Sequence, residues 1–115
     1  MSRDATYLLD ILESSRLARS HLGEMTKEQF LANVEKQDSV IRRLTIIGEA
    51  AGQISNQTRS QLSDLPWGSM IGMRNFMIHK YDDVDMVIVW GTVRNDLPVL
   101  ITRLEEFVSP QDRGE

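Results

Sequence analysis

The chain has 115 residues, of which 41% are hydrophobic and 26% charged, a composition typical of one globular domain and not of a disordered or fibrous protein. No apolar run reaches the roughly 20 residues of a membrane span, and the first residues lack the apolar core of a secretory signal, so we expect a cytosolic protein. The chain has no cysteine, which excludes disulfides and thiolate metal sites. It has only two histidines, which disfavours a transition-metal enzyme. The net charge of -4 argues against a broad basic surface, so any nucleic-acid chemistry would need a local pocket.

The first part of the chain predicts three helices. Apolar residues recur at helical spacing from Asp4 to about Arg19, and Gly23 supplies the stop that ends this first helix. Thr26 and Gln29 fit a capping box, so a short second helix should begin there. A third helix is predicted from an apolar stripe with steps of four, three, four and three residues, formed by Val40, Leu44, Ile47, Ala51 and Ile54.

Gly48 and Gly52 lie one turn apart beside this stripe. Glycine is a poor helix former, but its missing side chain lets another backbone approach closely, and that packing could offset the cost. We therefore expect a tight helix crossing at these two glycines.

The stretch "NQTRSQLSDLPWGS" reads as a loop that leads into a fourth helix. Pro66 can occupy the first turn of that helix, because an amide at this position would have no partner within the helix. The helix should therefore run from about residue 66 to 78. A long fifth helix is expected over residues 84–107, with a kink or break near Pro98, which has no amide to donate. The tail after it, "SPQDRGE", should be loose.

No segment shows sustained alternation of apolar and polar residues, and we find no internal repeat or linker. The predicted fold is therefore all-α, an antiparallel helical bundle of about five helices. We expect a single domain over residues 1–115, with a core from about residue 4 to 107.

The segment "GMRNFMIHKY" places three chemically capable side chains in a largely apolar run, namely Arg74, His79 and Tyr81. Each residue of a helix turns by about 100°, so Arg74 and His79 would point roughly 140° apart. Asn75 and His79 are four residues apart and share a face. Convergence of Arg74 with His79 therefore needs either a helix end near Ile78 or a second copy of the chain.

These residues have a purely structural interpretation and a chemical one. A histidine near a helix end interacts favourably with the helix dipole, and an arginine commonly packs its stem on a bundle surface. Alternatively, a histidine can take the proton from a ribose 2′-hydroxyl while an arginine holds the charge that builds on the attacked phosphate. That reaction uses RNA and not DNA, and it requires no metal.

The stretch "RNFMIHKY" resembles the R-x-x-x-x-H-x-Y signature of HepT toxins in the HEPN superfamily. The segments "YLLDILES", "RRLTIIGEAAGQIS", "LPWGSMIGMRN" and "VDMVIVWGTVRNDLPVL" are also similar to this family, so the resemblance covers residues 4 to about 107. It implies a small all-helical ribonuclease of a prokaryotic toxin-antitoxin pair, without a cofactor.

The resemblance also implies roles for single residues. Arg74 and His79 match the RNase pair, and Asn75 matches the polar residue that follows the arginine. Tyr81 matches the tyrosine to which an antitoxin, a minimal nucleotidyltransferase of the MntA type, can attach AMP. Members typically form homodimers in which two copies of the pair face one cleft, and this would bring Arg74 and His79 together.

Glu49, in "IGEAAG", is a further candidate, because its carboxylate could reach Arg74 or His79 and fix its orientation. A solvent-facing Glu49 is the alternative. Apolar residues crowd both sides of the fourth helix, namely Met70, Ile71, Met73, Phe76 and Met77. One side could meet a second copy of the chain, or the methionines could simply fill an irregular core. For the whole protein, the alternative to a ribonuclease is a non-catalytic helical partner of a nucleotidyltransferase.

Overall fold

The computed structural model describes residues 3–79 and 84–108, with every side chain in these ranges except those of Phe76, Ile78 and His79. These residues are helical apart from short connections, and no strand occurs among them, which confirms the all-α prediction. The elements in chain order are α1 (Arg3–Leu22), α2 (Lys27–Leu31), α3 (Val34–Gln53), α4 (Asn56–Gln61), α5 (Trp67–His79), α6 (Met86–Gly91), the π-helical turn η2 (Thr92–Asp96) and α7 (Leu97–Phe107). The tail at residues 109–115, expected to be loose, lies outside the described residues.

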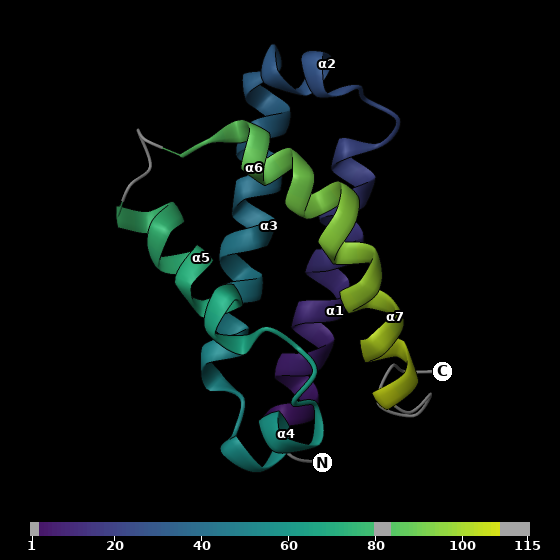
Figure 1. Cartoon of the computed structure of the whole chain (residues 1–115), viewed down its shortest axis with the longest axis vertical. Helices are drawn as coiled ribbons and strands as arrows, with labels where there is room; N and C mark the ends of the chain where they lie inside the picture. The colour runs from purple at the N-terminus through teal and green to yellow at the C-terminus, as the bar shows by residue number, and fades with distance from the viewer. Residues whose placement is uncertain (1–2, 80–83, 109–115) are drawn as a thin grey trace.

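Helix α3 is the centre of the bundle. It packs against α1 on one side and against α5 on the other (Figure 1). The continuous segment of α6, η2 and α7 crosses in front of α3 in this view and contacts α1. Successive long segments run in opposite directions, as Figure 1 shows, which confirms the antiparallel arrangement. None of the helices in the described ranges is long and apolar enough to cross a membrane.

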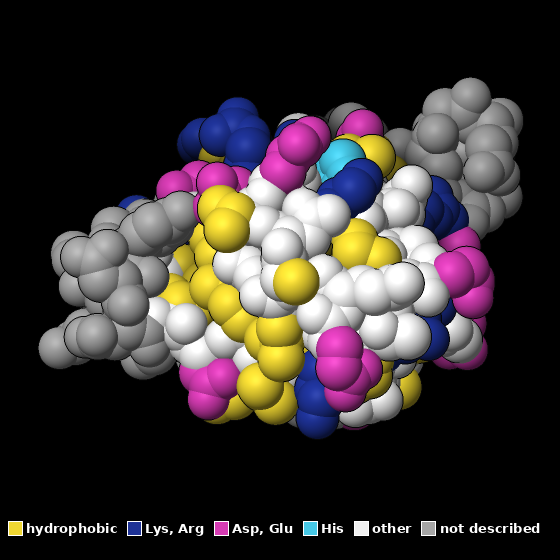
Figure 2. Space-filling view, turned by 90° about the horizontal axis from the view of Figure 1, so that it is seen from above, with side chains coloured by type: hydrophobic (Ala, Val, Ile, Leu, Met, Phe, Trp, Pro, Cys, Tyr) yellow, Lys and Arg dark blue, Asp and Glu magenta, His cyan; other side chains and the backbone are white. Residues whose placement is uncertain are grey.

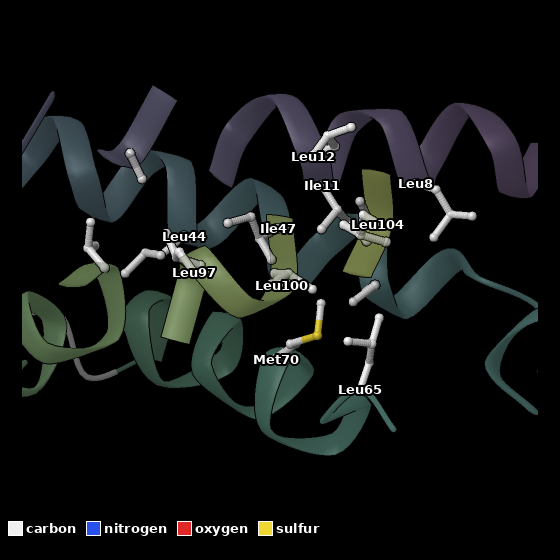
Figure 3. Close-up of a cluster of buried hydrophobic side chains, with 14 of the residues drawn as sticks. Leu8, Ile11, Leu12, Leu44, Ile47, Leu65, Met70, Leu97, Leu100 and Leu104 are labelled. Atoms are coloured by element: carbon white, nitrogen blue, oxygen red, sulfur yellow. The ribbon is translucent and has the colours of Figure 1, made fainter. Parts of the chain in front are cut away.

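The core forms where the apolar stripes of these helices meet. All five members of the predicted α3 stripe are buried, and they pack with buried leucines and isoleucines of α1 and α7 (Figure 3). Ser15 is also fully buried on α1, and its hydroxyl donates to the carbonyl of Ile11 at 2.7 Å, so the polar group is satisfied within its own helix.

Local sequence signals set the ends of the first helices as predicted. Gly23 follows α1 with φ of 57°, a left-handed conformation that glycine adopts without strain, and its amide donates to the Arg19 carbonyl at 2.8 Å. The capping box at the start of α2 is complete: the Gln29 amide donates to Thr26 Oγ1 at 3.2 Å, and the Thr26 amide donates to Gln29 Oε1 at 3.0 Å.

The expected loop after α3 contains the short helix α4, so that part of the prediction was wrong. None of the residues of α4 is buried, and hence no apolar period marked it in the sequence. Its start depends instead on a local cap, because the Thr58 amide donates to Ser55 Oγ at 3.3 Å.

The long fifth helix is interrupted next to Pro98, as expected, and the interruption is a π-helical turn. The Leu97 amide donates to the Thr92 carbonyl, five residues back, in place of the usual four. Because Pro98 has no amide and its ring would clash with the carbonyl four residues back, the wider turn places it near the start of α7 instead of in the interior of a helix.

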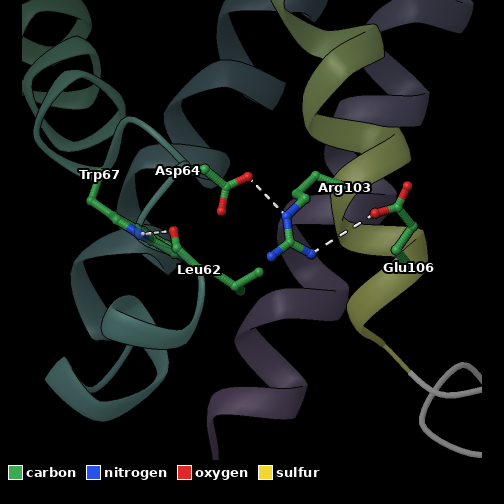
Figure 4. Close-up of polar contacts among 5 residues, drawn as sticks. All are labelled: Leu62, Asp64, Trp67, Arg103 and Glu106. Carbon is green, nitrogen blue, oxygen red and sulfur yellow. Dashed lines mark hydrogen bonds and ion pairs between the residues drawn. The ribbon is translucent and has the colours of Figure 1, made fainter.

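Polar contacts hold the segment before α5 against the rest of the bundle (Figure 4). The indole of Trp67 donates to the Leu62 carbonyl at 3.0 Å, which closes the turn between α4 and α5. The Arg103 guanidinium on α7 donates to the Asp64 carboxylate at 2.8 Å and lies 4.0 Å from that of Glu106. The start of α5 is thereby tied to α7.

The crossing of α3 and α5 depends on Gly48 alone. A Cβ atom built at Gly48 would lie 2.1 Å from the Cβ of Arg74 and 2.8 Å from the carbonyl oxygen of Met70, so only glycine permits this approach. For Gly52 the expectation was wrong, because, apart from its own stretch of α3, no described atom lies within 4 Å of the corresponding position. The two glycines are one turn apart, but α5 crosses α3 at the first and has moved away at the second.

We predict that Gly48→Ala destabilises the protein, because the new methyl group must push α5 away from α3. The expected loss is about 1–3 kcal/mol in the free energy of unfolding, the usual cost of overpacking. Urea denaturation followed by circular dichroism measures it. The control is Gly52→Ala, which fills open space and should stabilise the helix by up to about 1 kcal/mol. Equal effects of the two substitutions would contradict the close crossing.

Asp4 joins the start of α1 to the turn between α3 and α4. Its carboxylate accepts hydrogen bonds from the hydroxyl of Ser55, from the hydroxyl of Thr58 at 2.6 Å and from the Ser55 amide at 3.0 Å. These bonds, that of the Ser55 hydroxyl first, hold the pKa of Asp4 below its usual value of 3.8. Folding is therefore favoured by the ionised carboxylate.

This contact predicts a pH-dependent effect of Asp4→Asn. The folded pKa is depressed below its usual value of 3.8, so the stabilisation is complete above that value and is lost as the pH falls through the lower folded pKa. At neutral pH the variant should melt at a lower temperature than wild type, and the difference should shrink below about pH 4. Thermal melts across this range test it, with Glu13→Gln on the exposed face of α1 as the control. A difference that stays constant with pH would contradict this account.

Candidate functional site

Arg74 lies on α5 at its closest approach to α3. Its Cα and Cβ atoms press against Gly48, which fixes where the side chain leaves the helix. The side chain is 35% exposed, so its stem is held in the crossing while its guanidinium remains within reach of solvent. A cation placed in this way is available to an anionic ligand.

Two neighbours orient the guanidinium. Arg74 Nη1 donates to Asn75 Oδ1 at 2.9 Å, and Arg74 Nε lies 3.9 Å from Glu49 Oε1 on α3. The second distance is too long for a hydrogen bond, so Glu49 attracts the guanidinium without occupying its donors. Of the two expectations for Glu49, contact with Arg74 is observed, although 53% of its side chain is also exposed.

These residues line a groove of about 630 Å³ formed by α1, α3 and α5. Arg74, Asn75 and Ile71 line it from α5, and Tyr7 and Asp10 line it from α1. The residues contributed by α3 are Ile46, Gly48, Glu49, Ala50, Gly52 and Gln53. Three helices that are far apart in the sequence therefore contribute to one surface, with Arg74 as its basic residue.

The groove is not part of a basic surface. Its lining residues include one guanidinium, from Arg74, and two carboxylates, from Asp10 and Glu49. The end of the molecule that carries α2 and α6, seen in Figure 2, is not broadly basic either, because acidic and basic side chains are interspersed there around a band of hydrophobic ones. Hence an anion would be held at Arg74 itself and not by a general positive field.

The structure brings together only part of the predicted site. Arg74, Asn75 and Glu49 are in contact, whereas the side chain of His79 and the whole of Tyr81 lie outside the described residues. The backbone of α5 is helical through His79. Positions 74 and 79 are therefore roughly 140° apart around the helix axis, as the sequence analysis expected.

Sequence reasoning missed Tyr7, Asp10 and Gln53 as lining residues. Tyr7 fits the apolar spacing of the first helix, and none of the three was among the predicted site residues. A signal was present, since Tyr7 and Asp10 are three residues apart and Glu49 and Gln53 are four apart, spacings that place each pair on one helix face. Spacing alone could not show that the two faces meet. Within the described ranges, no three His, Asp or Glu side chains gather where they could hold a metal ion.

Comparison with known proteins agrees with the resemblance seen in the sequence. Residues 11–107 match the sequence profile of a family described as "Ribonuclease HepT-like". A "Probable ribonuclease HepT" of Thermococcus cleftensis is 39% identical over 101 residues, which cover 88% of this chain and 92% of that protein. A "Putative RNase MJ1380" of Methanocaldococcus jannaschii is 36% identical over 99 residues, which cover 86% of this chain and 91% of that protein. No solved structure matches the chain at a significant level. The chain belongs to the HepT-like ribonuclease family of the HEPN superfamily.

Proposed function

We propose that this protein is a metal-independent endoribonuclease and the toxin of a toxin-antitoxin pair. The observation that carries the proposal is the Arg74 guanidinium, held at an open groove by Gly48 and Asn75 in a chain of a ribonuclease family. The relatives reported above are named as ribonucleases, which supports RNA as the substrate. The signature supplies His79 as the second catalytic group.

The proposed reaction cleaves RNA by attack of a ribose 2′-hydroxyl on the adjacent phosphorus. His79 takes the hydroxyl proton, the new P–O bond forms and the bond to the 5′-oxygen breaks, with a proton delivered to that leaving oxygen. The products are a 2′,3′-cyclic phosphate and a free 5′-hydroxyl. Arg74 holds the negative charge that builds on the phosphate oxygens, and Glu49 and Asn75 keep its guanidinium in position.

We further propose that the working form is a homodimer in which Arg74 of one protomer meets His79 of its partner. The angle between the two positions on α5 supports this, because one helix does not direct both side chains to the same point. A second support is an apolar groove of about 1160 Å³ between α5 and the α6–α7 segment. Met73 lines it half-buried, and Met70 and Met77 line it from the core, where each is 5% exposed. Ile88 and Val99 also line it, and each is 67% exposed, as expected of a surface that a partner covers.

We predict that the purified protein cleaves RNA in the presence of EDTA. Arg74→Ala should lower the rate by about a hundredfold or more, because it removes the charge that stabilises the transition state. His79→Ala should lower it by a similar factor, because it removes the proton acceptor. Fragment analysis of a labelled RNA gives both the rate and the cyclic-phosphate ends. The matched controls are Arg42→Ala on an exposed part of α3 and His21→Ala, the other histidine of the chain.

Mixing the two inactive variants tests the dimer. A mixed dimer of Arg74→Ala and His79→Ala chains keeps one arginine and one histidine on different protomers. It should therefore recover cleavage that neither variant has alone. No recovery, although native mass spectrometry shows that mixed dimers have formed, would contradict a pair shared between protomers. Equal rates for wild type and both variants would remove the enzyme claim and leave the non-catalytic partner as the better account.

We also propose that a minimal nucleotidyltransferase of the MntA type switches the enzyme off by attaching AMP to Tyr81. The phenol oxygen of Tyr81 would attack the α-phosphorus of ATP, releasing pyrophosphate and the phenol proton. The added phosphate places negative charge two residues from His79 and should repel the substrate phosphate. The family signature, which includes Tyr81, supports this regulation.

Co-expression with such a transferase should add the mass of one AMP group and abolish RNA cleavage. The chain has two tyrosines, so the experiment has an internal control. Tyr81→Phe should remove the added mass and leave the nuclease active beside the transferase, whereas Tyr7→Phe should still be modified. Intact-mass spectrometry reads the modification. An unmodified Tyr81 beside a transferase that is active with ATP would exclude this mechanism.

A further inference from the structure

The groove beside Arg74 extends well beyond the place where a phosphate would bind. From Arg74 and Asn75 on α5 it crosses α3 at Gly52 and Gln53 and reaches Tyr7 and Asp10 on α1. The reaction outlined above uses only the α5 side. The volume of the whole groove, about 630 Å³, falls within the range of small-molecule sites, and one nucleotide fits in a site of this size.

The charge of the groove decides which part of an RNA it can take. Arg74 offers one positive charge, and Asp10 and Glu49 place two negative charges in the same groove. The carboxylates of Asp10 and Glu49 therefore disfavour a second phosphate between them, although the Arg3 guanidinium lies beside the Tyr7 hydroxyl at the α1 edge. The ligand on that side must be uncharged and must be able to donate hydrogen bonds to a carboxylate. In a nucleotide, the ribose hydroxyls and the base meet both requirements, and only the base also has a flat face that can stack on the ring of Tyr7.

The shape of the groove agrees with a flat ligand. Gly52 is exposed and leaves the surface of α3 open, because, apart from its own stretch of helix, no described atom lies within 4 Å of its Cβ position. Tyr7 provides an aromatic ring at the far side, and the Arg3 guanidinium donates to its hydroxyl at 3.4 Å, which helps to hold the ring in place. A base stacked on a tyrosine is a common arrangement in single-stranded RNA recognition, because every base has a π face.

We propose that Tyr7, Asp10 and Gln53 form a base-binding subsite for the nucleotide next to the phosphate at Arg74, and that this subsite prefers guanine. The Asp10 carboxylate has two acceptor oxygens, and guanine presents two adjacent donors, N1–H and the N2 amino group. Uracil presents one N–H between two carbonyl oxygens, which a carboxylate repels. The Gln53 amide can both donate and accept, so it adds contacts for either base. This inference rests on the proposed function, which supplies the phosphate at Arg74.

Binding of 5′-mononucleotides to the full chain tests the subsite without any cleavage. In NMR titrations, inorganic phosphate should shift the signals of Arg74 and Asn75 alone. GMP should in addition shift the Gly52 and Gln53 amides and the ring protons of Tyr7. GMP should bind about tenfold more tightly than UMP, with IMP, which lacks the N2 amino group, in between.

Two variants separate the base from the phosphate. In Asp10→Asn, GMP and UMP should bind with about equal affinity while phosphate binding persists. The control Glu13→Gln, one turn along α1, should keep the full preference for GMP. Gly52→Leu should fill the gap and weaken both nucleotides by about tenfold while it leaves phosphate binding intact. Its melting temperature should not fall, because it replaces a helical glycine whose Cβ position is open.

The outcomes distinguish this subsite from the nuclease. If GMP shifts no signal of Tyr7 or Gly52, or if Asp10→Asn keeps the preference, the subsite is wrong, whether or not RNA is cut. If GMP binds as described but RNA is not cleaved, the subsite stands and the ribonuclease is wrong. If RNA is cut and the sites of cleavage show a base preference that Asp10→Asn abolishes, both are supported.

Discussion

The site depends on the contact between Gly48 and the backbone of α5. Because Gly48 has no side chain, the Cα and Cβ atoms of Arg74 can lie directly against α3. That contact fixes the start of the arginine side chain and places it beside Glu49, the next residue along α3. A single methyl group at Gly48 would move the helix that carries the guanidinium. The contact of Gly48 with the Cα and Cβ atoms of Arg74 therefore sets both the packing of α5 on α3 and the position of the charge.

The weak pairing of Arg74 is as important as its position. A guanidinium fully hydrogen-bonded to a carboxylate would have to exchange one anion for another, whereas the 3.9 Å contact with Glu49 leaves most donors free. Two carboxylates in the groove also limit the ligand, because they allow one phosphate beside the arginine and disfavour a second. With a net charge of -4 the protein has no broad positive field, so under the proposed function RNA would be held at one point.

The π-helical turn and the arrangement of α5 show two ways in which helical geometry limits this fold. Near Pro98 the chain keeps its helical direction by widening one turn, so the segment from α6 to α7 can still cover the core. On α5 the same regular geometry separates Arg74 from His79, and a second protomer is the natural means to join them. This angle supports the proposed dimer, and the apolar groove beside α5 is a surface on which such a partner could pack.

The sequence by itself determined the long helices, because apolar period, a capping box and proline act over a few residues; the stripe from Val40 to Ile54 and the interruption near Pro98 were both correct. It missed the short helix α4, which has no buried residue. It also indicated Arg74 through its signature. Only the tertiary structure decided that α5 crosses at Gly48 and leaves Gly52 open, since spacing cannot show the angle between two helices. It alone placed Tyr7 and Asp10 opposite Arg74, because residues some 65 positions apart meet only when α1 and α5 pack on the same helix.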